Sequence, residues 1–408
     1  MKRDLTTRLP AMLTGDNLIR AMTVLPEYNA SICMKPPAQR LTALSDLYRM
    51  YLPSPMSLEI YSKLYLALLR SLQKKGTREA VRQKYENQKA VKQQASTGII
   101  GGSDSFTIIG MSGIGKSAAI GRALNLITDN RIIRVEEPYV QIIPCIVVQC
   151  PFDSSVKGLL LEILRKVDEQ LGSRYYQNAL RIRATTDMLI GSVSQVALNH
   201  IGLLVVDEIQ NVVSSKNGRS LVGMLTQLIN NSGISICMVG TPESVEFFEQ
   251  AMQLARRSLG LQYGRLAFDG YFHDFCRTLY RYQYTGKQTE ITPAIVEWLY
   301  AHSAGVISVV VSLIHDAQEI AILNGTEELN QAALEEAYQK RLALLHSYIQ
   351  PEINMKLPPV AKRKPIRSER KALRETVQIA ALAKKAKEEQ VDMVKLLRQY
   401  MAVDEVKI

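Results

Sequence analysis

A glycine-rich loop with one lysine and one serine carries the clearest chemistry in the sequence. Residues 110–117 read GMSGIGKS, which matches G-x-x-x-x-G-K-[ST] at every fixed position. Glycines let backbone amides surround phosphate oxygens without side-chain clash, and the start of a following helix adds free donors. We expect Lys116 to reach the β- and γ-phosphates and Ser117 to ligate Mg²⁺. The predicted ATP-binding loop consists of Gly110, Ser112, Gly113, Ile114, Gly115, Lys116, Ser117 and Ala118.

Two adjacent carboxylates end a later apolar run, Ile201–Val206. Asp207 is predicted to complete the Mg²⁺ shell, and Glu208 to act as the general base that activates a water molecule. Two carboxylates at the end of a buried strand are costly unless a cation lies near them. A strand that simply ends in a solvated loop is the alternative. The Asp-Glu pair favours a hydrolysing ATPase over a small-molecule kinase.

A third apolar run, Ile234–Val239, is followed by Gly240 and Thr241. Thr241 is predicted to contact the γ-phosphate or the attacking water. A structural role is also open, because Thr241 precedes Pro242 and Glu243 and could cap a helix that begins there.

Paired arginines follow this segment in Gln253-Leu-Ala-Arg256-Arg257. ATPases of the AAA+ class place an arginine from a neighbouring subunit against the γ-phosphate, where it stabilises transition-state charge. Arg256 and Arg257 are the predicted finger, with Arg265 as a further candidate. A solvated basic patch is the alternative for all three.

The elements that must position these residues alternate along the middle of the chain. Expected strands are 105–109, 141–149, 201–206 and 234–239, with helices between them at 118–127, 155–171 and 220–231. The strands are β-branched and almost continuously apolar, as in a parallel sheet that is buried on both faces. This rhythm predicts a three-layer αβα P-loop core of the AAA+ class with a parallel sheet.

The flanking regions divide the chain into four predicted parts. Residues 1–98 form a helical N-terminal region with one amphipathic helix at 58–72 and a polar, solvated helix or connector at 74–94. The core spans 99–268. A small helical lid spans 269–348, with helices at 272–284, 293–303, 306–324 and 330–346. A basic tail, 349–408, begins with four prolines that indicate a linker.

Composition limits the possible partners. The chain has 408 residues and a net charge of +11, which favours a polyanionic partner such as nucleic acid. More than half of that surplus lies in the tail. The five cysteines form no C-x-x-C pair, the first residues lack a signal-peptide core, and no uncharged apolar stretch is long enough to span a membrane. We therefore expect a cytoplasmic protein without membrane partners.

The assembled motifs resemble the AAA+ transposition regulators of the TnsC/TniB group. The matching segments are GMSGIGKS, LLVVDEIQ, MVGTPE followed by ARRSLG, and the residues at 150–160, 303–306 and 318–324. The resemblance covers roughly residues 95–345. Flanking regions at both ends make TnsC the closer match than the shorter TniB. One departure is that no arginine follows Gly305 in the lid, which leaves the coupling of the lid to ATP open.

The resemblance implies how such a protein acts. Subunits would assemble with ATP on double-stranded DNA as a hexameric ring or helical filament. They would bridge a target selector of the TnsD/TniQ type to a transposase of the TnsA/TnsB type, and ATP hydrolysis would dissolve the assembly. The N-terminal region would dock the selector and the basic tail the transposase, and the protein would join the bacterial nucleoid when on DNA.

Basic residues of the core are the candidates for contact with DNA phosphates. Lys157 opens the helix after the second strand, and Arg181 and Arg183 flank an apolar position further along. Ordinary solvated helix faces are the alternative. No base-reading motif is present, so binding should be independent of DNA sequence.

Two other functions stay open at this point. An AAA+ replication initiator or helicase loader would have a similar core, although residues 349–408 contain a single basic helical pattern and no helix-turn-helix. A P-loop signalling ATPase would act without DNA, which the net charge argues against.

Overall fold

The computed structural model describes residues 5–92, 94, 98, 100, 105–129, 131–135, 140–212, 218–245 and 260–342. Arg256, Arg257 and the basic tail therefore lie outside the described residues, and their predicted roles remain predictions. The division of the chain at residues 98, 268 and 348 also remains a prediction.

A six-stranded sheet forms the centre of the fold, in the order β2-β3-β4-β5-β1-β6. All neighbours are parallel except the β2-β3 pair. The strands are β1 (Phe106–Gly110), β2 (Ile133–Val135), β3 (Val140–Gln149), β4 (Ile201–Asp207), β5 (Ser235–Gly240) and β6 (Leu261–Tyr263). The four predicted strands are confirmed to within a residue. Strands β1, β4 and β5 are apolar runs buried on both faces, whereas β3 alternates between buried and exposed residues in its second half.

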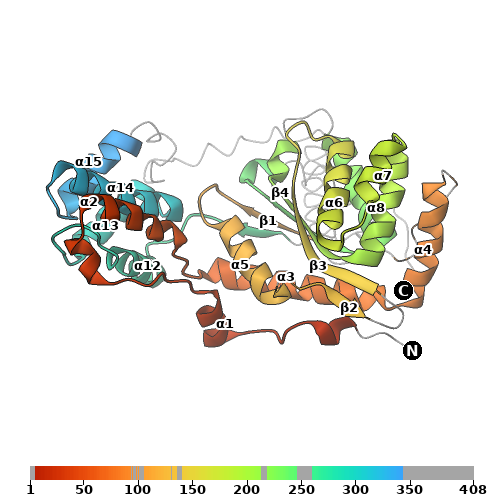
Figure 1. The fold of residues 1–408 in the computed structure, drawn as a ribbon, viewed down its shortest axis with the longest axis horizontal. Helices are drawn as coiled ribbons and strands as arrows, with labels where there is room; N and C mark the ends of the chain where they lie inside the picture. The colour runs from red at the N-terminus through yellow and green to blue at the C-terminus, as the bar shows by residue number, and fades with distance from the viewer. Residues whose placement is uncertain are drawn as a thin grey trace, which may run out of the picture. The chain divides into compact units, whose positions relative to one another are not determined.

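Helices cover both faces of this sheet (Figure 1). Successive residues of β4 alternate between the layers: Leu204 and Val206 join one buried cluster, and Leu203 and Val205 the other. The first layer contains α6 (Val156–Leu171), α7 (Tyr175–Arg181), α8 (Thr186–His200) and α9 (Gly218–Ser232). The second contains α1 (Gly15–Met22), α3 (Pro55–Lys75) and α5 (Lys116–Thr128). The predicted three-layer αβα core is confirmed.

The N-terminal region supplies part of this core. Helix α3 packs on α5, β4 and β5, and Leu64, Leu68 and Leu72 are fully buried there. The hydroxyl of Ser235 donates to the carbonyl of Ala67 at 2.9 Å. The amphipathic pattern at 58–72 thus marks a helix whose apolar face covers the sheet.

Helix α4 (Arg78–Val91) corrects the expectation of a solvated helix at 74–94. It packs against α8, and its buried face is polar. Gln83 donates to Asn87 at 3.0 Å, and Asn87 donates to the carbonyl of Asn231 at 2.9 Å. Because the buried amides bond to each other and to backbone, a polar sequence can form a buried helix face, which periodicity of apolar residues alone does not reveal.

The helical lid follows the sheet. It contains α12 (Gly270–Tyr280), α13 (Pro293–Ser303), α14 (Ile307–Asn324), α15 (Gln331–Ala337) and a π-helical turn at Tyr338–Leu342. The helix predicted at 272–284 corresponds to α12, which ends four residues earlier. The helix predicted at 330–346 corresponds to α15, which continues into the π turn. Helix α14 is the one helix of the described residues with the length and composition of a membrane span, and it packs within the buried cluster of the lid.

A second part of the N-terminal region is packed on this lid. Leu44 and Leu47 belong to the buried cluster of α12–α15. Both lie in a 3₁₀ helix at Leu44–Arg49, which follows the short helix α2 (Pro37–Ala43) and precedes α3.

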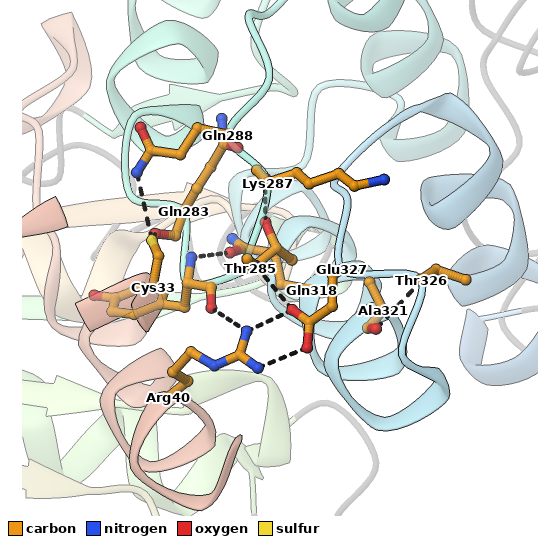
Figure 2. Close-up of polar contacts among 12 residues, drawn as sticks. Cys33, Arg40, Gln283, Thr285, Lys287, Gln288, Gln318, Ala321, Thr326 and Glu327 are labelled. Carbon is orange, nitrogen blue, oxygen red and sulfur yellow. Dashed lines mark hydrogen bonds and ion pairs between the residues drawn. The ribbon is translucent and has the colours of Figure 1, made fainter. Parts of the chain in front are cut away.

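Arg40 of α2 fixes this attachment (Figure 2). Its guanidinium donates to both carboxylate oxygens of Glu327, at 2.5 and 2.6 Å, and to the carbonyl of Tyr284 at 3.0 Å. Nearby, Cys33 donates to the carbonyl of Gln283 at 3.1 Å. The N-terminal region therefore ties the sheet layer, through α3, to the lid, through α2.

Candidate functional site

The phosphate-binding loop lies where β1 ends and α5 begins. Gly113 and Gly115 have φ of 82° and 94°, values that L side chains rarely adopt. Gly115 occupies the N-cap position of α5, which has no side-chain cap. The first amides of α5 thus remain available to an anion, as the sequence predicts.

The order of the sheet brings the acidic pair to this loop. Strand β5 separates β1 from β4, and all three end at the same edge. The hydroxyl of Ser117 donates to Oδ2 of Asp207 at 3.2 Å, across 90 residues of sequence. A hydroxyl and a carboxylate are the hard oxygen ligands that Mg²⁺ takes, so these two residues fit a Mg²⁺ ion.

A cleft of about 280 Å³ joins the predicted site residues. It is lined by Ser112, Gly113, Gly115, Lys116, Ser117, Ala118, Asp207, Glu208, Gln210, Gly240, Thr241 and Ser308. Of the predicted ATP-binding residues, Gly110 and Ile114 do not line it. Gly110 is buried beneath the loop, where an added Cβ would lie 2.6 Å from the Ile114 side chain.

Lys116 points into the loop itself. Its ammonium donates to the carbonyls of Gly110 and Met111, at 2.6 and 2.8 Å. Burial lowers the pKa of Lys116, and the carboxylates of Asp207 and Glu208 oppose this shift. A half-buried cation that bonds to neutral carbonyls would gain from a nearby phosphate.

Glu208 has a strained backbone. Its φ is 58°, in the left-handed region that costs a residue with a Cβ roughly 1 kcal/mol or more. Its backbone amide donates to Oδ1 of Asp207 at 2.8 Å, and the side-chain amide of Gln210 donates to its carboxylate. With this backbone conformation, Glu208 lines the cleft.

Thr241 lines the same cleft from the end of β5. The short 3₁₀ helix that follows it, Pro242–Ser244, has no side-chain cap, so the alternative capping role is not seen. The Thr241 hydroxyl oxygen is shielded from solvent and has no hydrogen-bond partner among the described residues. It is therefore available to a ligand in the cleft.

An apolar cavity that the sequence analysis did not predict lies next to the cleft. This cavity, of about 260 Å³, is lined by three distant segments: residues around Tyr48–Ser57, the loop, and the lid residues Phe275, Leu279 and Val311. It shares Gly113, Gly115, Ala118 and Ser308 with the cleft. No local motif predicts such a cavity, because it forms only when the N-terminal region, core and lid meet.

The lid touches the loop directly. The amide of Ser308, in the first turn of α14, donates to the carbonyl of Gly113 at 3.1 Å. An added Cβ on Gly113 would lie 2.4 Å from the Ser308 hydroxyl. The lid therefore contacts the phosphate loop without the arginine that many AAA+ lids use.

The predicted DNA contacts are all exposed. Lys157 lies in the first turn of α6, and Arg181 and Arg183 lie at the end of α7 and just after it. None of the three forms an ion pair within the described ranges. Arg265, the further finger candidate, lies beside the loop of its own chain, with Nε 3.3 Å from the sulfur of Met111.

One other group could hold a metal ion among the residues that the structure covers: His315, Asp316 and Glu319 on α14. Arg341 already pairs with Asp316 at 3.4 Å and with Glu319 at 2.6 Å. Both carboxylates therefore already have an arginine partner within the lid.

Comparison with known proteins supports the family resemblance. The model of the bacterial TniB protein family matches residues 101–261, a range that includes the loop, the acidic pair and Thr241. The predicted likeness to the TnsC/TniB group is confirmed for this range. No curated protein matches the chain.

Several solved structures resemble the chain more distantly. The Orc1 protein of Aeropyrum pernix, in complex with DNA, is 16% identical with a TM-score of 0.41, and the match covers 64% of either chain. Drosophila ORC bound to DNA is 12% identical with a TM-score of 0.44, over 97% of this chain and 83% of the other. Domain III of the Thermotoga maritima replication initiation protein DnaA is 15% identical with a TM-score of 0.35, over 67% and 94%. The chain thus spans less than two thirds of the Aeropyrum Orc1 chain.

Proposed function

We propose that this chain, whose residues 101–261 match the TniB family, is an ATPase that regulates DNA transposition. The observation that carries the ATPase part is the contact between Ser117 and Asp207 at 3.2 Å, in a cleft that also holds Lys116, Glu208 and Thr241. Five chemically suitable side chains from three neighbouring strand ends converge there.

Each residue has a distinct part in the proposed reaction. Lys116 and the amides at the start of α5 bind the phosphates. Ser117 and Asp207 hold Mg²⁺, which when bound supplies positive charge to the phosphate oxygens. Glu208 accepts a proton from the attacking water, and Thr241 binds the water or the γ-phosphate. Arg256 or Arg257 of a neighbouring subunit is the proposed finger.

The apolar cavity is the proposed binding site of the adenine base. It adjoins the loop through Gly113, Gly115 and Ala118 and is lined by Tyr51, Leu279 and other apolar side chains. Flat, largely apolar ligand parts bind in cavities of this kind. A base held there would touch the N-terminal region and the lid at once.

The DNA part of the proposal is supported by charge and by family likeness. The net charge is +11, and Lys157, Arg181 and Arg183 are exposed on the core. We propose sequence-independent binding to double-stranded DNA as a hexameric ring or helical filament. A TnsD/TniQ-type selector and a TnsA/TnsB-type transposase are the proposed partners, with TnsC the closer relative. ATP hydrolysis would dissolve the assembly.

The first test separates nucleotide binding from hydrolysis. Lys116→Ala should lose ATP binding, and Glu208→Gln should bind ATP normally but hydrolyse it at least 100-fold more slowly. Undiminished hydrolysis by Lys116→Ala would refute the assigned site. Normal turnover by Glu208→Gln would remove Glu208 from its role.

The second test concerns DNA. Wild-type protein, duplex DNA and a non-hydrolysable ATP analogue should give rings or filaments threaded by DNA in negative-stain micrographs. Affinity should fall steeply between low and moderate salt. The double change Arg181→Gln, Arg183→Gln should flatten this salt dependence, whereas Arg277→Gln, an exposed arginine on the lid, should not. Binding that does not depend on salt would contradict the proposal.

A further inference from the structure

Gln210 lies beside the proposed general base but has no role in the sequence analysis. It follows Glu208 by two residues, in a 3₁₀ turn at Ile209–Val212. Its side-chain amide donates from Nε2 to Oε2 of Glu208. It also lines the phosphate cleft. Its position is therefore suited to act on the same reacting group as Glu208.

The other end of the Gln210 amide is a buried acceptor. Its Oε1 is shielded from solvent and has no hydrogen-bond partner within the described part of the chain. An added Cβ on Gly240 would lie 3.2 Å from this oxygen, so the oxygen faces the end of β5 just before Thr241. A buried oxygen without a donor is costly, and such groups in folded proteins commonly serve a ligand or water.

The orientation of the amide is fixed by chemistry. Glu208 carries a carboxylate, which only accepts hydrogen bonds when ionised, so the NH₂ of Gln210 must face it. The carbonyl oxygen then faces the end of β5, where Gln210 and Gly240 both line the cleft. The turn itself is anchored, because Asn211 donates to the carbonyl of Cys150 at 3.0 Å and its own carbonyl accepts from Ser154 at 3.0 Å.

We propose that Gln210 is a positioning residue that orients the attacking water together with Glu208. The water donates one hydrogen to the Glu208 carboxylate and the other to Oε1 of Gln210. As the water oxygen bonds to the γ-phosphorus, Glu208 takes the first proton. The bond from the γ-phosphorus to the β–γ bridging oxygen breaks, and its electron pair leaves with ADP. Gln210 keeps both of its own protons throughout. This inference rests on the proposed ATPase function.

The test replaces Gln210 by methionine, which keeps the length of the side chain but has no amide. Gln210→Met should lower single-turnover hydrolysis roughly 10- to 100-fold, since misplaced reactants cost about this much. The dissociation constant for a fluorescent ATP analogue should stay within about twofold of the wild type, because the positioned water is not part of nucleotide binding. Gln195→Met is the matched control, since Gln195 on α8 also has a buried Oε1 without a partner but does not line the cleft. It should leave both values unchanged.

A double-mutant cycle adds a measurement that a merely structural role would not affect. In a Glu208→Gln background, Gln210→Met should slow the remaining hydrolysis less than about threefold, because both side chains act on one water. Equal losses in both backgrounds, wild-type hydrolysis by Gln210→Met, or parallel losses of affinity and rate would overturn the inference. Failure of the proposed function itself is distinguishable, because wild-type protein would then not hydrolyse ATP or Lys116→Ala would still do so.

Discussion

The ion pair between Arg40 and Glu327 should be a large single contribution to the attachment of the N-terminal region to the lid. The Arg40 side chain is only 5% exposed, and that of Glu327 is 26% exposed. Both guanidinium-carboxylate bonds are short, and the third bond goes to a backbone carbonyl. Arg40→Met keeps much of the apolar volume and removes all three bonds.

The size of the effect follows from what remains after the change. Removing one partner of a buried ion pair costs about 3–5 kcal/mol. Glu327 is partly exposed and would still accept from the amide of Gly286 at 2.8 Å. We therefore expect Arg40→Met to lie near the lower end, at about 3 kcal/mol of unfolding free energy. Glu327→Gln should cost at least as much, because it leaves the more deeply buried charge without a partner.

The lid has a built-in reporter for this measurement. Trp298 is the single tryptophan of the chain and is buried in the cluster that includes Leu44 and Leu47. Its fluorescence during urea titration therefore follows unfolding of the lid. Arg49→Met is the matched control: Arg49 pairs with Asp46 at 3.0 Å but is 73% exposed, so its loss should cost less than about 1 kcal/mol.

The pH dependence gives a second check on the same pair. The hydrogen bond from Arg40 is the main reason why the pKa of Glu327 is lowered from its ordinary value of 4.5. A lowered folded-state pKa means that the stabilisation is complete above 4.5 and is lost as the pH falls through the folded value. The difference between wild type and Arg40→Met should thus shrink in acid. A loss below about 1 kcal/mol at pH 7, or one no larger than that of Arg49→Met, would refute the reasoning.

Three further outcomes follow from the packing and the charges. Gly202→Ala should lower the free energy of unfolding by about 1–3 kcal/mol, because a Cβ there would lie 2.5 Å from both the Leu68 side chain and the Pro144 carbonyl. The control for thermal unfolding is Gly223→Ala, where nothing lies within 4 Å of an added Cβ. Equal stabilities of the two variants would contradict this prediction. Burial lowers the pKa of Lys75 to about 7. As the pH rises from 7 towards 10.5, wild type should gain stability relative to Lys75→Met, because Lys75 binds a proton in the unfolded chain but not in the folded one. Parallel pH profiles of the two proteins in urea titrations would contradict this. Ser308→Asp should weaken ATP binding about tenfold by charge repulsion, whereas Ser308→Ala, which keeps the amide contact with the loop, should not; calorimetric titration would show whether the two variants differ.

Much of the core could be predicted from the sequence because its signals are local. A strand buried on both faces must be apolar along its whole length, so 201–206 and 234–239 stand out without any knowledge of their neighbours. The phosphate loop is equally local, since the glycines, Lys116 and Ser117 that surround one phosphate group are consecutive in the chain. The order of these elements also made it reasonable to expect that Asp207 and Thr241 would meet the loop.

Other features depend on contacts between segments that are far apart in the chain, and only the tertiary structure decides them. Arg40 reads as one more surface arginine until α2 packs on the lid and places Glu327 opposite it. The apolar cavity forms only when residues near Tyr48, the loop and α14 come together. The polar face of α4 can be buried because its side-chain amides bond to one another and to backbone. Gln210 can be assigned a role only because the backbone at Glu208 is left-handed and both Glu208 and Gln210 line one cleft. Sequence patterns report which surface of an element is apolar, but partners across the fold are chosen by the packing of the whole chain, where burial makes each unpaired polar group costly.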